Sequence, residues 1–346
     1  MRRSTITDVA HEAGVSIKTV SRVARQEPNV TEKTRLKVQA AMDKLSYRPT
    51  MAARSTVSTR SFLLGMIFDN PNPAYTVALL RGALDAAKSN GYHMVVEPVD
   101  GESDNLPDLI RDLVVQSNLE GLIVPPPLCD RPDVLHVLQE IGRPFSRIAP
   151  SEDVGSGFDI AMDDRLAACA ITEHLVEFGH RRIGFIKGRA GTATTRRRLE
   201  GYCDGMADID QDVPDNLFKQ GDFSLRSGLT CGEELLSLPD RPTAIFASND
   251  EMAAGVLMAA HKLGISVPEE LSVAGFDDSE TATSMWPNLT TIRQPIFDMA
   301  GRAVTSLIEH QRSGGKEPKT RKLDLDFELI IRESTGPAPT ELNVKG

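Results

Sequence analysis

Side chains able to contact DNA gather in residues 17–22, which read IKTVSR. The residues that helical spacing turns outward are Ile17, Lys18, Thr19, Ser21 and Arg22. Lysine and arginine bond well to guanine O6 and N7, and an isoleucine can contact a thymine methyl group. We therefore expect Ile17, Lys18 and Arg22 to read base edges, with a solvated surface charge as the alternative for Lys18.

Further polar side chains near this segment are suited to hold a DNA backbone without choosing its sequence. A helix amino terminus adds N–H groups that attract anions, and Ser16 is placed to begin such a helix. The residues expected to contact DNA around the base-reading set are Thr5, Ser16, Thr19, Ser21, Arg22, Asn29, Thr34, Arg35 and Tyr47.

These side chains need a helix-turn-helix to position them, and the sequence has its pattern. Apolar residues recur at helical spacing on both sides of Gly14 within residues 5–25. Thr5 and Ser16 are suited to cap the two helices, and Gly14 permits the tight turn between them. In this motif the second helix lies in the DNA major groove. Taken alone, the same residues also fit an ordinary helical hairpin.

A third helix is predicted from Thr31 onward, with Tyr47 closing a small core that the three helices share. Its buried stripe is expected to consist of Leu36, Val38, Ala41, Met42 and Leu45. The following residues, 48–60, contain a proline and then mostly small and polar side chains. Residues 51–57 are too few for a helix that is stable alone, so they should become helical only when DNA or a partner supports them.

Charge is distributed unevenly along the 346 residues. The net charge is −10, yet residues 1–60 hold 12 Lys and Arg against 5 Asp and Glu, which leaves 27 against 44 for the remainder. A basic head on an acidic body is expected when only the head contacts phosphate. The length indicates more than one domain, and no apolar run is long enough to cross a membrane.

From Phe62 onward, short apolar strands alternate with amphipathic helices up to Phe276. This alternation predicts parallel sheets covered by helices on both faces, divided into two α/β lobes with the first break near Asp159. We expect a head at residues 1–49, a hinge at 50–60, a two-lobed body at 61–336 and a polar tail at 337–346. A ligand of such a body should lie beyond the carboxyl ends of the strands, between the lobes.

Polar residues that follow the apolar strands are the candidates for this ligand site. They are Asp69, Asn70, Asp163, Asn249, Asp250, Asp277 and Asp278, with Tyr75 and the lone tryptophan, Trp286, expected nearby. For Asp164, Asp250 and Asp278 a helix-capping role is an equally good interpretation. Carboxylates and amides bind hydroxyl groups, so a polar, sugar-like ligand is expected.

Other chemistry is poorly supported by the sequence. No phosphate-binding loop or serine-nucleophile motif is present, and His174 and His180 are better explained by packing or capping than by metal binding. The four cysteines are far apart and indicate free thiols in a reducing compartment. We therefore expect no enzyme activity, cofactor or metal. With no signal peptide recognisable, a cytoplasmic protein is expected.

Across nearly its whole length the chain resembles the lactose/galactose-repressor family of bacterial transcription regulators. The resemblance lies in DVAHEAGVSIKTVSRV, PNVTEKTR and YRPTMAARS, then in EHLVEFGHRRIGFI, RRRLEGY, TAIFASNDEMAAGVL, GISVPEELSVAGFDD and LTTIRQP. It implies a DNA-binding head joined to a body like a periplasmic binding protein, a homodimer on a palindromic operator, and control by a small molecule, most often a sugar.

The resemblance also implies roles for individual residues. Arg198 would reach the ligand cleft, Phe223 would stack on the ligand, and Ala53 and Arg54 would lie near the DNA minor groove. The family usually has leucine where this chain has Thr56, so the resemblance implies that the wedge that kinks DNA is weakened or is replaced by neighbouring Val57.

Three other functions stay open from sequence alone. A purine could replace the sugar as effector, and a body of this kind alone would also fit a sugar-binding transport protein or an enzyme of the same fold. The tail after Glu333 lacks leucine heptads, which favours a dimer over a tetramer.

Overall fold

A computed structural model of the chain describes residues 4–24, 30–45, 47, 60–69, 72–152, 154–207, 213–315 and 321–340. The chain forms two compact units, Met1–Phe62 and Leu63–Gly346. The expected hinge helix at 51–57 lies outside the described residues. Within the described ranges, no helix is long and apolar enough to cross a membrane.

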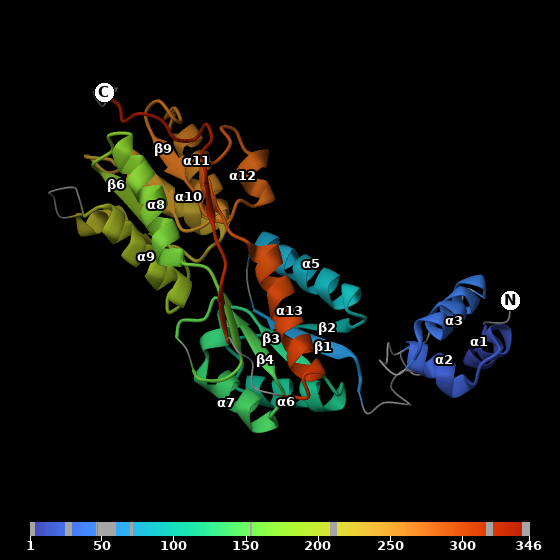
Figure 1. Cartoon of the computed structure of the whole chain (residues 1–346). Helices are drawn as coiled ribbons and strands as arrows, with labels where there is room; N and C mark the ends of the chain where they lie inside the picture. The colour runs from blue at the N-terminus through green and yellow to red at the C-terminus, as the bar shows by residue number, and fades with distance from the viewer. Residues whose placement is uncertain are drawn as a thin grey trace. The chain divides into compact units, whose positions relative to one another are not determined.

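The first unit contains α1 (Ile6–Ala13), α2 (Ile17–Ala24) and α3 (Glu32–Lys44) (Figure 1). The predicted helix-turn-helix is therefore confirmed. Thr5 and Asp8 form a reciprocal cap, with Thr5 N donating to Asp8 Oδ2 at 2.7 Å. Gly14 ends α1 at φ 58°, a left-handed conformation that glycine adopts without a Cβ penalty. Thr19 N donates to Ser16 Oγ at 3.1 Å, as expected for a residue that begins α2.

The core of this unit confirms most of the predicted α3 stripe. Val38, Ala41 and Met42 are buried against α1 and α2, and Tyr47 joins them. Leu36 is a correction, because its side chain is 63% exposed. At about 100° per residue, Leu36 lies on the opposite side of the helix from Val38, so both cannot face one core.

The second unit contains two α/β lobes. Among the described residues, lobe 1 has a six-stranded sheet in the order β11-β5-β4-β3-β1-β2, and every pair in it is parallel. Its strands are β1 (Leu63–Phe68), β2 (His93–Pro98), β3 (Gly121–Val124), β4 (Phe145–Ile148), β5 (Phe158–Ala161) and β11 (Lys322–Asp324). Its helices are α5 (Pro73–Ser89), α6 (Leu106–Gln116), α7 (Pro132–Ile141) and α13 (Ile296–Arg312), with a 3-10 turn at Leu128–Asp130. Helices α5 and α13 pack together, as do α6 and α7 (Figure 1).

Lobe 2 has a four-stranded parallel sheet among the described residues, in the order β7-β6-β8-β9. Its strands are β6 (Ile183–Lys187), β7 (Phe218–Gln220), β8 (Ala244–Ala247) and β9 (Ser272–Ala274). Its helices are α8 (Asp164–Glu177), α9 (Ala193–Gly205), α10 (Leu225–Leu236), α11 (Asp250–Lys262) and the short α12 (Glu280–Ser284), with a 3-10 turn at Asp215–Leu217. Helices α8 and α9 pack together, as do α10 and α11.

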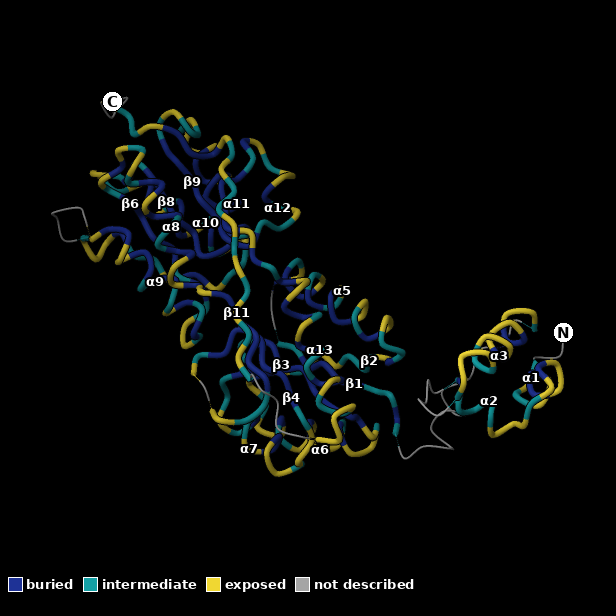
Figure 2. The backbone as a smooth tube through the Cα atoms, in the orientation of Figure 1, coloured by how far each residue is buried: buried dark blue, intermediate teal, exposed yellow. Residues whose placement is uncertain are grey.

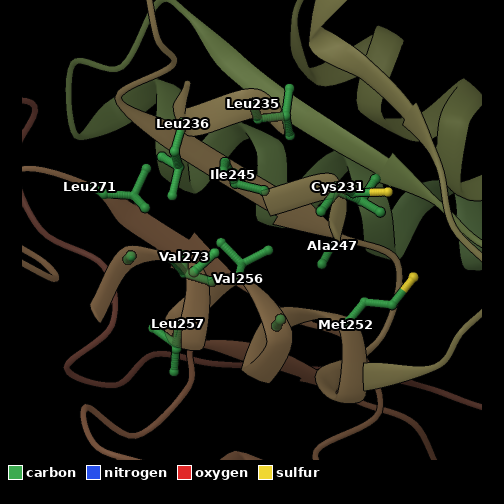
Figure 3. Close-up of a cluster of buried hydrophobic side chains, with 14 of the residues drawn as sticks. Cys231, Leu235, Leu236, Ile245, Ala247, Met252, Val256, Leu257, Leu271 and Val273 are labelled. Carbon is green, nitrogen blue, oxygen red and sulfur yellow. The ribbon is translucent and has the colours of Figure 1, made fainter. Parts of the chain in front are cut away.

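Burial follows these layers: the inner strands of each sheet are buried, whereas the edge strands β2, β7 and β11 and the outer helix faces are partly exposed (Figure 2). In lobe 2, side chains of α10 and α11 meet those of β8 and β9 in a cluster that includes Leu235, Ile245, Met252 and Val256 (Figure 3). Burying such side chains stabilises the fold by about 1.5–3 kcal/mol each. This packing holds the strands in place, so the residues that follow their carboxyl ends are also held in position.

The chain passes between the lobes three times within the described residues: after β5, before α13, and between β11 and β12 (Glu328–Ile330). Strand β12 pairs antiparallel with β10 (Thr291–Arg293) beside lobe 2. Asp159 lies inside β5, which pairs with β4, so the first crossing comes a few residues later than the expected break. The predicted pair of α/β lobes is confirmed.

Candidate functional site

The outward face of α2 offers the side chains that sequence predicts for reading DNA. Ile17 is 49% exposed despite its apolar side chain, and Lys18 beside it is exposed. Thr19, Ser21 and Arg22 are partly exposed. Ser16 Oγ and Thr19 Oγ1 lie 2.9 Å apart at the amino end of this helix. The residues thus form one polar surface around an exposed isoleucine.

Several of the residues predicted to contact the DNA backbone lie at the starts of helices. Thr34 and Arg35 are partly exposed in the first turn of α3, where Thr31 Oγ1 and Thr34 Oγ1 lie 2.9 Å apart. Thr5 is exposed at the start of α1. Tyr47 packs into the core. Four more of these predictions, Asn29, Ala53, Arg54 and Thr56, lie outside the described residues.

A cavity lies between the two lobes of the second unit. Its walls come from segments that follow strands of both sheets, as expected for parallel α/β lobes. Its lining residues are Asn72, Tyr75, Pro126, Pro127, Ala149, Arg189, Thr192, Thr194, Arg198, Phe223, Asn249, Asp277 and Gln294. Five of the predicted residues, Tyr75, Arg198, Phe223, Asn249 and Asp277, are thereby brought together.

Arg198 projects from α9 and is held rigidly. Its Nε donates to Asp164 Oδ1 at 2.8 Å and its Nη1 donates to Ser248 O at 2.6 Å. The guanidinium carbon lies 3.7 Å from the centroid of the Phe276 ring, a cation–π contact. Asp164 is buried, so its charge is compensated by Arg198. Arg198 therefore lines the cavity with its guanidinium held in place by a buried ion pair.

Asp277 is a buried carboxylate that receives hydrogen bonds from both lobes. Gln294 Nε2 donates to its Oδ1, and Asn72 Nδ2 of lobe 1 donates to its Oδ2 at 3.2 Å. Burial raises the pKa of Asp277 to about 7, although the nearby positive charge of Arg198 acts to lower it. Its φ of 123° is a strained backbone conformation for a residue with a side chain, and such strain often accompanies functional sites.

Phe223 and Asn249 form one corner of the cavity. Asn249 Nδ2 donates to Phe223 O at 3.0 Å, while Asn249 Oδ1 accepts from Met252 N and caps α11. Phe223 adopts φ 71°. Its ring packs on Gly188, where an added Cβ would lie 2.0 Å from Phe223 Cζ. The aromatic ring is therefore fixed by a position that only glycine fits.

Ion pairs close the space between the lobes at its rim. Arg189 of lobe 2 lies 3.4 Å from Asp69 and 3.0 Å from Glu102, both in lobe 1. Together with the bond from Asn72 to Asp277, these contacts hold the lobes in a closed arrangement.

Other predicted ligand-site residues do not line this cavity. Asp163 caps α8 by accepting from Leu166 N at 2.9 Å, and Trp286 is 80% exposed. Asp69 lies at the rim, where it pairs with Arg189. Asn70 lies outside the described residues.

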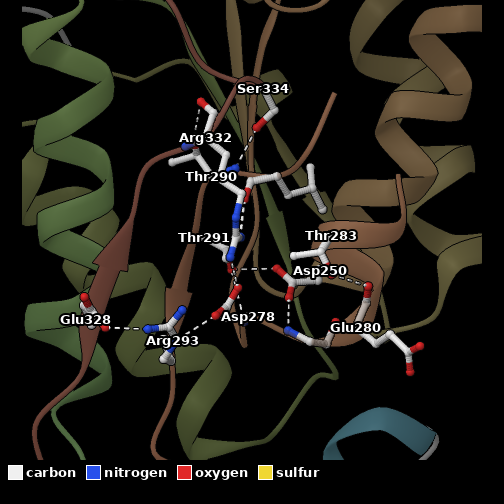
Figure 4. A network of polar contacts seen from close by, with 12 residues as sticks. Asp250, Asp278, Glu280, Thr283, Thr290, Thr291, Arg293, Glu328, Arg332 and Ser334 are labelled. Atoms are coloured by element: carbon white, nitrogen blue, oxygen red, sulfur yellow. Dashed lines mark hydrogen bonds and ion pairs between the residues drawn. The ribbon is translucent and has the colours of Figure 1, made fainter. Parts of the chain in front are cut away.

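The network in Figure 4 explains two of the ambiguous carboxylates as structural groups. Asp250 accepts from Thr291 Oγ1 at 2.6 Å and from Ser279 N at 2.7 Å. Asp278 pairs with Arg293 at 2.7 Å and with Arg332 at 2.5 Å. Both carboxylates are satisfied within the protein.

Sequence reasoning missed Asn72, Gln294, Arg189 and the two threonines of the cavity. Asn72 caps α5 through Tyr75 N, and its amide nitrogen is left to face Asp277. Asn72 and Arg189 each lie a few residues after a strand, β1 and β6, and this position was the sequence signal that could have identified them. Gln294 follows β10, a strand that composition alone did not reveal.

Comparisons with known proteins agree with this arrangement. Residues 5–50 match the family described as bacterial regulatory proteins, lacI family, and residues 172–335 match a periplasmic binding protein-like domain. The ribose operon repressor of Escherichia coli (strain K12) is 33% identical over 311 residues, covering 88% of this chain and 92% of that protein.

Solved structures of regulators are also similar. The Lac repressor dimer bound to operator and the anti-inducer ONPF has a TM-score of 0.77 and 28% identity, covering 97% of this chain and 100% of that one. The complex of transcriptional regulator CelR with cellobiose has a TM-score of 0.71 and 27% identity, covering 96% and 100%.

The helix-turn-helix unit and the two-lobed body match regulators along almost their full length, and those relatives are repressors rather than enzymes. The chain belongs to the lacI family of bacterial regulatory proteins and is a DNA-binding transcription regulator.

Proposed function

We propose that this regulator is a repressor that binds a palindromic operator as a homodimer and responds to a sugar held in the interlobe cavity. The names of its relatives support this proposal, since one represses a ribose operon and another was solved with cellobiose. The Lac repressor structure supports dimeric operator binding.

The chemistry of the interlobe cavity is the observation that carries the sugar proposal. Its polar groups are mainly amides and hydroxyls, and Asp277 is the only carboxylate among the described residues that line it. Arg198 and Arg189 are already paired with carboxylates of the protein, so they do not demand a charged ligand. Phe223 and the neighbouring prolines supply an apolar wall for the C–H face of a sugar ring.

In this proposal each part of the chain has its own role. Residues 1–49 read DNA, 50–60 form a hinge with Ala53, Arg54 and Thr56 near the minor groove, 61–336 bind effector and partner, and 337–346 form a tail. The base-reading residues are Ile17, Lys18 and Arg22. We place the protein in the bacterial cytoplasm, at the nucleoid.

Closure of the lobes is the step that connects effector to DNA in this proposal. Asn72 and Asp277 come from different lobes, so a sugar bound to both is sensitive to how the lobes are placed. An effector changes DNA affinity only if it binds the two states of the dimer unequally.

Fluorescence anisotropy of a labelled duplex from the protein's own promoter region tests this function, with a scrambled duplex as control. The titration is repeated with a panel of sugars and purines. Selective binding that a sugar alters is the expected result. Equal binding to the scrambled duplex would contradict the DNA-reading proposal, and a response to purines alone would contradict the sugar proposal.

A further inference from the structure

The segment from Arg189 to Arg198 belongs to lobe 2, where it leads into α9 and forms its first turns, yet it contacts lobe 1 at two places. Four of its residues line the interlobe cavity: Arg189, Thr192, Thr194 and Arg198. Two of its arginines, Arg189 and Arg197, bond to loops of lobe 1. The same short segment therefore faces both the cavity and the neighbouring lobe.

The first contact is the ion pair of Arg189 at the rim, and groups on both sides of it are held in place. Arg189 lies 3.4 Å from Asp69 and 3.0 Å from Glu102, in the loops that follow β1 and β2. The carbonyl oxygen of Arg189 accepts from two threonine hydroxyls at the start of α9, at 3.0 and 2.9 Å. An added Cβ at Gly101 would lie 2.2 Å from Asp69 Oδ2, so this carboxylate packs where only glycine leaves room. Because both partners are positioned by their own lobes, less side-chain entropy is lost when they meet.

The second contact is made by Arg197. Its Nη2 donates to the carbonyl oxygen of Ser151 at 2.6 Å, in the loop that follows β4. That loop is anchored within lobe 1, because Ser151 N donates to Asp130 Oδ1 at 2.8 Å. Arg197 is not among the described residues that line the interlobe cavity. Its contact with lobe 1 can therefore be removed without taking away a group that faces the effector.

Both contacts depend on how the two lobes are placed. Arg189 and Arg197 reach their acceptors only in this placement, because the acceptors lie in loops of the other lobe. The bond between Asn72 and Asp277 inside the cavity depends on the same placement. The cavity groups of the two lobes also face each other only here, so this is the placement that binds the effector. The apparent affinity of a ligand falls in proportion to the population of the state that binds it.

We propose that Arg189 and Arg197 form a two-point clamp that holds lobe 1 in the effector-binding placement, and that they are positioning residues of this regulator. The inference rests on the proposed function, since it takes the interlobe cavity as the effector site. The clamp holds the lobes together before the effector arrives, so the effector enters a cavity that is already formed. Breaking the clamp lowers effector affinity and, without effector, moves operator affinity in the direction opposite to the effector's own effect.

A distance between the lobes, measured without any ligand, tests the clamp. Cys203 in lobe 2 is exposed, and His136→Cys adds a thiol at an exposed position of α7 in lobe 1. Spin labels on these two thiols, in a Cys169→Ser background, report the interlobe distance by double electron–electron resonance. Dilution with unlabelled protein restricts the signal to distances within one chain.

The native chain should give one narrow interlobe distance distribution, and Arg189→Gln/Arg197→Gln should broaden it. Arg196→Gln is the matched control, because it removes an exposed guanidinium that pairs with Glu200 of the same helix at 3.1 Å. This control should give the native distribution. Thermal melting establishes that each variant is folded. An identical distribution in the native chain and in Arg189→Gln/Arg197→Gln would overturn the clamp.

Affinities give a second readout, with the sugar that alters DNA binding as the probe. Arg197→Gln and Asp69→Asn should each raise the sugar Kd by up to about tenfold, although neither residue is among the described residues that line the cavity. Without sugar, anisotropy should show that Arg197→Gln shifts the operator Kd in the direction opposite to the shift that sugar causes. Unchanged sugar Kd in both variants, or an operator shift in the same direction as that of sugar, would overturn the proposal. If no sugar alters DNA binding while Arg189→Gln/Arg197→Gln broadens the distance distribution, the sugar proposal fails and the clamp is supported.

Discussion

Asp277 makes sugar binding dependent on pH, if the interlobe cavity is the effector site. Burial raises the pKa of this carboxyl to about 7, so its charged and neutral forms are both populated near neutrality. A carboxylate offers about four acceptor positions, and Asn72 and Gln294 occupy two of them. The ionised group offers both remaining positions to sugar hydroxyls, whereas protonation turns one oxygen into an O–H donor and weakens acceptance at the other.

The size of the change in sugar affinity with pH follows from the fraction of Asp277 that is protonated, because a sugar that binds the ionised form displaces a proton. With a pKa of about 7, roughly a tenth of the groups are protonated at about pH 8 and roughly nine tenths at about pH 6. The apparent Kd should therefore rise between these two pH values by at most about tenfold, the limit in which only the ionised group binds sugar, with up to about one proton released per sugar at the lower pH. The protein should therefore bind the sugar more weakly at the lower pH.

Isothermal titration with the sugar that alters DNA binding measures this effect, in buffers of different ionisation enthalpy to count protons. Asp277→Asn removes the titrating group but keeps the shape of the side chain, so its sugar affinity should be lower and nearly independent of pH. The lining of the cavity contains no histidine. Two results would refute the reasoning: an equal sugar Kd at both pH values in the native protein, or the same dependence of Kd on pH in Asp277→Asn as in the native protein.

Three further predictions concern stability. Arg147 lies fully buried, 2.6 Å from Asp159, so Arg147→Met should lower the free energy of unfolding by about 3–5 kcal/mol, because it removes one partner of a buried ion pair. Urea denaturation of this variant against Arg147→Met/Asp159→Leu checks whether removing both charges restores stability. Burial lowers the pKa of His180 below 6.5, so the folded state favours the neutral ring and stability should fall as pH drops below about 6.5; thermal melting at decreasing pH should show a weaker dependence in His180→Gln, and an identical dependence would contradict this account. Val38→Ala should destabilise the first unit by about 2 kcal/mol while Leu36→Ala should change it by less than about 0.5 kcal/mol; hydrogen exchange of the α1–α3 amides measures both, and equal effects would contradict the assigned helix face.

Local patterns predicted the first unit and most of the strand–helix alternation. Caps such as Thr5 and the left-handed Gly14 depend on residues only a few positions away, so they can be read from sequence. Local patterns could not predict the complete fold of lobe 1, because α13 and β11 from the far end of the chain pack into it. Nothing in the sequence near Ile296 indicates which sheet that helix will cover.

The interlobe cavity shows the same limit for individual residues. Arg198 was found because its motif resembles that of a family, and Asp277 was found because it follows an apolar strand. The structure brings both together with Asn72 and Gln294. Asp163 follows a strand as Asp277 does, yet it turns to cap α8. A polar residue after a strand therefore has two competing partners, the nearby helix end and the cavity, and only packing decides between them.

The most direct test of the central claim is whether sugar and operator binding are coupled. Anisotropy gives the operator Kd with and without saturating sugar, and titration calorimetry gives the sugar Kd with and without saturating operator. Linkage requires the two ratios to be equal. We predict a reciprocal change in both affinities, which Arg198→Met should abolish by removing sugar binding. Unchanged operator affinity at saturating sugar would contradict the account.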